Sequence, residues 1–157
     1  MTQVVLNHSP QTLRGAPNSA LLYALRAQAC DASVRFGCGS EHCGACTVIV
    51  NGKPENACTL PLWAAEQAEV LTAQSLPEHP VGQHVLAAFM HEQAAQCGYC
   101  INGILMRLTA LFSQHPDADD ALLRETLSRH LCRCGSHVRI LRAAKRAQQS
   151  LRAARPA

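Results

Sequence analysis

The first half of the chain alternates polar and apolar residues in short runs, which is typical of strands that bury one face. The clearest run is Gln3–His8, and the turn residues after it lead into a second expected strand at Gln11–Arg14. A β-branched run at Thr47–Val50 is followed by Asn51-Gly52, a strong hairpin signal. The returning strand is expected at Lys53–Ala57. Together these runs predict a small sheet.

Helical periodicity marks much of the rest of the chain. Ser19 is expected to cap a helix that runs to Ala29 and carries three leucines on one face. Beyond the turn-forming segment Leu76–Gly82, apolar residues recur at helical spacing in four further stretches. These are centred on Val85–Phe89, Ile101–Phe112, Leu122–Leu127 after a cap at Asp119 or Asp120, and Ile140–Ala144 after a cap at Ser136. Four helices with short links favour an antiparallel bundle.

The change of period predicts an α+β chain of two domains. We place the first domain at residues 1–76 and the second at residues 82–157. With 157 residues, of which 48% are hydrophobic and 16% charged, the chain can bury a core, although each half alone is marginal in size. Bound metal is therefore expected to stabilise the fold as well as to provide its chemistry.

Charge and hydropathy exclude several classes of protein. The net charge is +3, and the basic residues concentrate only near the C-terminus, as on the solvated face of a helix. Because 4% of the residues are aromatic, no nucleic-acid surface is expected. No apolar run reaches the roughly 18 residues that span a membrane, and Met1–Leu6 does not begin a secretory signal. We therefore expect a soluble, cytoplasmic chain, in which a disulfide framework is disfavoured.

Eight of the nine cysteines form two groups of four with different spacings. The first group follows the pattern C-x4-C-x2-C-x11-C and comprises Cys38, Cys43, Cys46 and Cys58. This spacing is typical of the thiolates around a plant-type [2Fe–2S] cluster. Three ligands so close in sequence require a tightly curled loop, which the neighbouring glycines permit. The expected hairpin then returns the fourth ligand to the side of Cys46.

The second group follows the pattern C-x2-C-x31-C-x-C and comprises Cys97, Cys100, Cys132 and Cys134. These residues lie at the ends of the expected helices, where helix N-termini favour an anionic cluster. The spacing also suits zinc, so the residues alone leave both a second cluster and a zinc site open. The ninth cysteine, Cys30, is expected to pack as a small hydrophobic residue outside both groups.

Three motifs resemble those of one known family. They are Gly37-Cys38-x4-Cys43-Gly44-Ala45-Cys46-Thr47, Gln96-Cys97-Gly98-Tyr99-Cys100-x2-Gly103 and Cys132-Arg133-Cys134-Gly135. In this order they look like the small iron–sulfur subunit of molybdenum hydroxylases, the xanthine dehydrogenase and aldehyde oxidoreductase family. The stretches Glu92–Gln96 and Cys134–Val138 look most like the branch of nicotinate dehydrogenase and isoquinoline 1-oxidoreductase.

The resemblance implies a β-grasp, plant-type ferredoxin domain followed by a four-helix domain, each with one [2Fe–2S] cluster. It also implies that the second cluster lies nearer to a molybdopterin cofactor on a large partner subunit, with Gln96 and Cys134 closest to the pterin. In this family the large subunit hydroxylates a carbon atom of its substrate, and the small subunit carries the electrons away. The implied substrate is an N-heteroaromatic compound resembling nicotinate, or an aldehyde. The implied acceptor is cytochrome c or a flavin subunit.

Two other hypotheses fit the same cysteines. A stand-alone two-cluster ferredoxin would carry electrons without a dedicated enzyme partner. A binding module stapled by zinc would transfer no electrons at all. Metal content and copurifying chains distinguish the three hypotheses.

Overall fold

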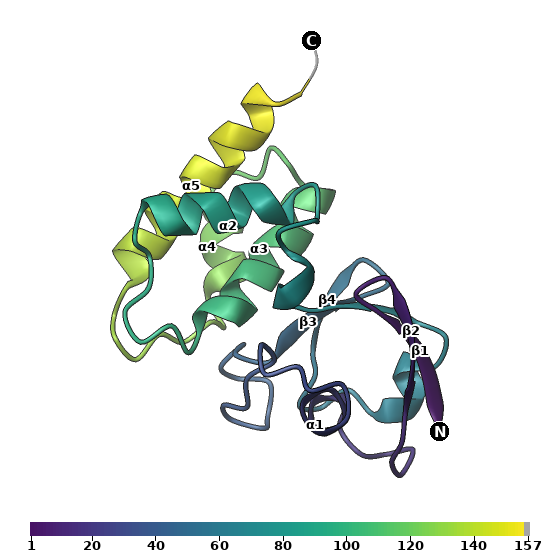
Figure 1. The fold of residues 1–157 in the computed structure, drawn as a ribbon. Coiled ribbons are helices and arrows are strands. Elements are labelled where there is room, and N and C mark those ends of the chain that lie inside the picture. The colour runs from purple at the N-terminus through teal and green to yellow at the C-terminus, as the bar shows by residue number, and fades with distance from the viewer. Residues whose placement is uncertain (156–157) are drawn as a thin grey trace.

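The computed structural model describes residues 1–155, and its first half contains a five-stranded sheet (Figure 1). The strands are β1 (Thr2–Leu6), β2 (Ser9–Leu13), β3 (Thr47–Val50), β4 (Lys53–Asn56) and β5 (Glu69–Leu71). They lie in the order β2-β1-β5-β3-β4. Strands β1 and β5 are parallel, and the other neighbours are antiparallel. The four predicted strands are confirmed, whereas the three residues of β5 are too few to show a period.

The first strand ends earlier than its alternation predicts. Asn7 and His8 have positive φ angles of 47° and 66°, and they form the turn between the paired residues Leu6 and Ser9. Two successive residues with positive φ match the twist of the flanking strands in a short hairpin. The last two residues of the predicted strand Gln3–His8 therefore belong to the turn.

A short helix, α1 (Leu21–Ala27), packs on the sheet through leucines that are fully buried. Its core partners include Val48 of β3 and Val70 of β5. The predicted cap is wrong, because the hydroxyl of Ser19 donates to the carbonyl of Ala16 at 2.7 Å and makes no cap hydrogen bond. Two 3-10 turns, η1 (Leu62–Ala65) and η2 (Ala73–Ser75), flank β5.

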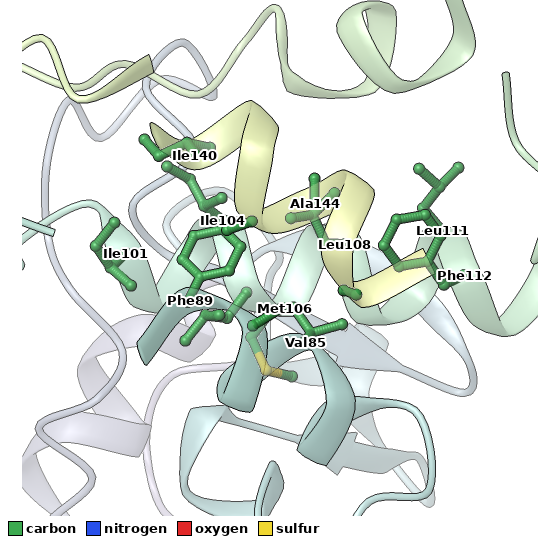
Figure 2. Packing of buried hydrophobic residues seen from close by; sticks show 14 of the residues in the cluster. Val85, Phe89, Ile101, Ile104, Met106, Leu108, Leu111, Phe112, Ile140 and Ala144 are labelled. Carbon is green, nitrogen blue, oxygen red and sulfur yellow. The ribbon is translucent and has the colours of Figure 1, made fainter. Parts of the chain in front are cut away.

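Four helices form the second half as far as Arg155, as the periodicity predicts. They are α2 (Gly82–His91), α3 (Ile101–Gln114), α4 (Asp120–Leu127) and α5 (His137–Ala153). Figure 2 shows Val85 and Phe89 of α2 gathered with side chains of α3 and α5, among them Ile104 and Ile140. No helix within residues 1–155 combines the length and apolar character needed to cross a membrane.

The N-termini of α4, α5 and α2 differ in whether a side chain accepts from their first N–H groups. The carboxylate of Asp119 accepts from the N–H of Leu122 at 2.8 Å, which confirms one of the two predicted caps of α4. Ser136 occupies the predicted cap position of α5, although its side chain makes no cap hydrogen bond. At the start of α2, the Nδ1 atom of His79 accepts from the N–H groups of Val81 and Gly82 at 3.1 and 3.0 Å.

The buried apolar residues form two clusters, one between the sheet and α1 and the other among the helices. Ile49 of β3 and Leu71 of β5 belong to the helical cluster, because α3 packs against the face of β3 that α1 does not cover. All four residues of β3 are consequently buried. The clusters match the expected halves, but the division at residues 76 and 82 remains a prediction.

Candidate iron–sulfur centres

The first thiol group is built by the loop between α1 and β3 together with the end of β4. Cys38 is exposed, Cys43 is half-buried, and Cys46 is buried immediately before β3. The hairpin of β3 and β4 returns Cys58 to the loop, and the N–H of the preceding Ala57 donates to the carbonyl of Cys46 at 3.2 Å. The structure therefore brings together four residues that span 21 positions of the sequence.

Backbone N–H groups of the loop point at its sulfur atoms. Those of Ser40 and His42 donate to Cys38 Sγ at 3.4 and 3.2 Å, and that of Cys38 donates to Cys43 Sγ at 3.3 Å. Burial by itself would raise the pKa of Cys38, but the hydrogen bonds to its sulfur together outweigh burial and bring the pKa to about 6. Donors in this arrangement stabilise negative charge on sulfur, as a cluster ligand requires.

Two glycines allow the loop to curl. A Cβ atom on Gly37 would lie 2.4 Å from Cys43 Sγ, so only glycine fits beside that sulfur. Gly44, between Cys43 and Cys46, has a φ of +69° and presses against the ring of His130. The loop is thus shaped for close approach to sulfur rather than for packing side chains.

The second thiol group joins the two connections between helices. Cys97 and Cys100 lie between α2 and α3, and Cys132 and Cys134 lie between α4 and α5. The N–H of Tyr99 and the thiol of Cys134 lower the pKa of Cys97. Burial raises the pKa of Cys100 to about 12, and the thiol of Cys132 adds to the rise.

The thiols within each group are neighbours in pairs. Cys38 lies with Cys43 and Cys46 with Cys58 in the first group, and the pairs of the second group are Cys97 with Cys134 and Cys100 with Cys132. Within residues 1–155, no three His, Cys, Asp or Glu side chains surround one metal-ion position. A [2Fe–2S] cluster takes four thiolates shared between two irons, so a paired arrangement fits it.

The most buried thiols need a metal in order to ionise. Cys46 is 2% exposed, and burial raises its pKa to about 12, with the thiols of Cys58 and Cys43 adding to the rise. A thiol that binds a metal loses its proton outright, because the positive charge of the metal replaces the lost hydration. The residues present therefore fit a bound cluster, and iron would hold the inner thiols as thiolates.

The two residues expected to lie closest to a pterin are placed side by side. Gln96 Nε2 donates to the carbonyl of Cys134 at 3.5 Å, across the connections that carry the second group. Near them, Leu131 and Val138 are 60% and 64% exposed and apolar. This end of the helical half therefore combines cysteine thiols with exposed apolar side chains.

Cys30 departs from expectation, and His130 has a place that the sequence analysis does not predict. Cys30 is exposed with a φ of 52°, so the prediction that it packs as a hydrophobic residue is wrong, although it does lie outside both groups. His130, two positions before Cys132, is 4% exposed and lies against the loop of the first group. Burial, aided by Arg107, lowers its pKa to about 4, so its ring is neutral. In the sequence, its position two residues before a cysteine of the second group is the signal that points to it.

Comparison with known proteins agrees with this geometry. A family model described as a 2Fe-2S iron-sulfur cluster binding domain matches residues 18–92, and one described as a [2Fe-2S] binding domain matches residues 70–145. The corresponding chain of nicotinate dehydrogenase from Pseudomonas putida is 42% identical over 94% of each chain. The alpha chain of isoquinoline 1-oxidoreductase from Brevundimonas diminuta is 37% identical over 94% of this chain and 97% of that one.

Solved structures show the same fold. Quinoline 2-oxidoreductase from Pseudomonas putida 86 superimposes with a TM-score of 0.88 at 25% identity, over 98% of this chain and 96% of the matching one. Aldehyde oxidoreductase from Desulfovibrio desulfuricans gives a TM-score of 0.86 at 33% identity over 97% of this chain, but only 17% of its own longer chain.

A ferredoxin-like sheet joined to a helical half, with a cluster-binding domain matched in each, defines an electron-transfer protein with two [2Fe–2S] clusters. The chain belongs to the family of small iron–sulfur subunits of molybdenum hydroxylases, and it is the electron-transfer component of such an oxidoreductase. Members of this family work within complexes of several chains.

Proposed function

We propose that this chain receives electrons from a large partner subunit, which carries the molybdopterin site, and passes them to an external acceptor. The Cys97, Cys100, Cys132 and Cys134 thiolates hold the cluster that faces the pterin, and the Cys38, Cys43, Cys46 and Cys58 thiolates hold the cluster that faces the acceptor. Gln96 and Cys134 lie at the pterin end. What the bound iron supplies is one-electron chemistry, and what the chain supplies is position and hydrogen bonds.

The observation that carries this proposal is a direct link between the two thiol groups. The N–H of Leu131 donates to the carbonyl of Cys43 at 3.1 Å, and Leu131 is bonded to Cys132. One hydrogen bond therefore joins a residue of the first group to the residue that precedes a member of the second. Such a contact holds the two sites at a fixed separation, which suits a carrier whose sites act in series, whereas a zinc-stapled module has no use for it.

Iron analysis and EPR of the purified complex test this assignment. About four irons per chain and two distinct signals after reduction are expected, since each [2Fe–2S] cluster contributes one. Zinc without iron in either site would contradict the proposal. Isolation of the chain from its native source as a stable monomer without a partner would favour the stand-alone carrier instead.

We propose an N-heteroaromatic substrate ahead of an aldehyde. The names of three similar proteins refer to nicotinate, isoquinoline and quinoline, all nitrogen heteroaromatics, and others refer to aldehydes. The purified complex is expected to reduce an artificial dye with nicotinate, isoquinoline or quinoline, and more slowly with benzaldehyde. Turnover of aldehydes alone would overturn this choice.

For the acceptor we propose cytochrome c or a flavin subunit. We also propose that the chain is cytoplasmic, because its cysteines are free thiols. Reduction of added cytochrome c by the complex and its substrate, in a preparation free of flavin, would support the first. A copurifying flavin-containing chain would support the second.

A further inference from the structure

The segment that leads into Cys132 is held by contacts on both sides. The N–H of His130 donates to the carbonyl of Leu127, at the end of α4, at 2.9 Å. The next N–H, that of Leu131, donates to the carbonyl of Cys43 at 3.1 Å. The backbone therefore passes from a helix end across the first thiol loop before it reaches the second thiol group.

The side chain of His130 fills the space between this segment and the loop. A Cβ atom built on Gly44 would lie 2.5 Å from Cδ2 of the ring and 2.6 Å from Nε2, so the glycine gives the ring its place. Nε2 lies 3.3 Å from Thr47 Oγ1, whose hydroxyl already donates to the carbonyl of Gly44 at 2.8 Å. The ring nitrogen must therefore be the donor to Thr47.

These contacts connect His130 with both sides of the first site. Gly44 follows Cys43, and Thr47 follows Cys46, so the ring touches the neighbours of two thiols of that group. Its own backbone stands two positions before Cys132. The imidazole is 4% exposed, and a polar ring buried to this degree is expected to have a hydrogen-bond partner.

We propose that His130 is a positioning residue, which sets the separation of the two clusters by holding the Leu131 amide against the Cys43 carbonyl. This inference rests on the proposed function. The step that it serves moves one electron from iron in the second site to iron in the first, with no bond broken and no proton transferred. Both the magnetic interaction and the electron exchange between two centres weaken steeply as the distance grows or a bonded contact is lost.

The test uses the purified enzyme complex with both clusters reduced. At low temperature, the interaction between the two paramagnetic sites splits or broadens their EPR lines. Hydrogen exchange measured on the peptide that contains Leu131 reports the amide contact independently of activity. The variants are His130→Ala, His130→Gln, which retains a side-chain N–H donor, and Thr47→Val, which removes the hydroxyl that contacts the ring and with it the hydrogen bond to the Gly44 carbonyl.

Gln114→Ala is the matched control. The Nε2 atom of Gln114 donates to the carbonyl of Gly52 at 2.8 Å, so this variant also loses a contact between a helix and the sheet. The substituted residue itself lies 14 positions from the nearest cysteine, Cys100. It is expected to keep the EPR splitting of the unaltered complex and its exchange at Leu131.

His130→Ala is expected to keep its iron, to lose EPR splitting, and to speed exchange at Leu131 about tenfold, as the loss of a buried hydrogen bond would. His130→Gln should recover most of the splitting. Unchanged splitting and exchange in His130→Ala, or an equal change in Gln114→Ala, would overturn the inference. If His130→Ala loses a cluster, Thr47→Val decides, and unchanged splitting there overturns it.

The failure of this inference is distinct from that of the proposed function. A complex without two iron–sulfur signals would defeat the proposed function before any variant is made. A complex with two signals but no magnetic interaction between them would defeat the inference alone. So would an EPR splitting that is the same in the original complex and in the variants of His130.

Discussion

Gly103 sets how closely α3 can approach the first thiol loop. A Cβ atom at this position would lie 2.0 Å from the carbonyl oxygen of Gly44 and 3.0 Å from its carbonyl carbon. Both are backbone atoms, which cannot move aside as the end of a flexible side chain can. The contact between α3 and the first thiol loop therefore depends on the absence of a side chain at Gly103.

Gly103→Ala is expected to destabilise the protein although alanine favours helices. Replacement of glycine inside a helix ordinarily gains about 1 kcal/mol. Here the added methyl overlaps a backbone carbonyl, and overpacking of this kind costs about 1–3 kcal/mol. Chemical denaturation of the iron-loaded protein measures the change. Gly52→Ala provides the comparison, because that position has a φ of +77° but open space around it. A stabilised Gly103→Ala variant would show that the helix can shift without cost.

Among the elements, α4 and α2 differ in how their first turns are satisfied. The cap of α4 is a carboxylate three residues before the N–H that it accepts, a pattern visible in the sequence. The cap of α2 is a histidine ring that lies outside the helix and folds back onto it. The sequence predicts the carboxylate cap of α4, which is a common kind of cap. It does not predict the histidine ring at the start of α2.

Asp119→Ala should lower the free energy of unfolding by about 1 kcal/mol, since it leaves an N–H of α4 without its acceptor. Asp119→Asn should restore most of that loss, because asparagine caps helices equally well. Thermal unfolding of both variants gives the measurement. An alanine variant as stable as the original would mean that water replaces the carboxylate at this helix end.

The cap at His79 makes the start of α2 sensitive to pH. Burial lowers the pKa of His79, the nearby His8 lowers it further, and Glu69 opposes both. Its folded pKa thus lies below the unfolded value of about 6.5, so the unfolded chain binds the proton more tightly. The stability that the neutral ring contributes is complete above that value and is lost as the pH falls below it.

The expected result is a stability gap between the original protein and His79→Ala that narrows as the pH falls below about 6.5. Denaturant midpoints over a pH series measure the gap, and the remaining histidines cancel because both proteins contain them. A gap that is constant or widens toward acid would contradict a neutral acceptor at this cap.

At the scale of the whole molecule, the helical half contributes all four thiols of the second group, and the sheet half contributes all four thiols of the first group. The first thiol group comes from one loop and one hairpin, and the second from the two connections between helix pairs. Yet the halves share a packed face, since Ile49 and Leu71 belong to the helical core. Separate sites on a joined body suit a carrier that holds two centres at a fixed distance.

Cys43→Ser is expected to abolish the EPR signal of the first cluster and to leave that of the second in place. The second group takes no ligand from the loop, although the Cys43 backbone still contacts Leu131. Cys30→Ser is the matched control and should retain both signals, because Cys30 lies outside both groups. Equal loss of both signals in Cys43→Ser would argue against the division into two domains.

Particular residues show how far the sequence alone can reach. The hairpin at Asn51-Gly52 and the cap at Asp119 are predictable, because each is a local preference of a few neighbouring residues. The same rule predicts caps at Ser19 and Ser136. The hydroxyl of Ser19 donates to the carbonyl of Ala16 instead, and Ser136 stands at the cap position without a side-chain cap hydrogen bond. Strand β5 has too few residues to show a period, and only its pairing with β1 and β3 defines it.

The sequence by itself determined the two thiol groups and the elements around them. Ligand spacing within a loop and the period of apolar residues are local properties. They sufficed to expect one plant-type [2Fe–2S] site and a second metal site of four thiols on an α+β chain, and the resemblance to a known family made the second site a cluster. Only the tertiary structure decided that His130 is buried, that Gly103 meets Gly44, and that Cys30 stays at the surface. Those facts depend on contacts between distant segments, which no local pattern contains.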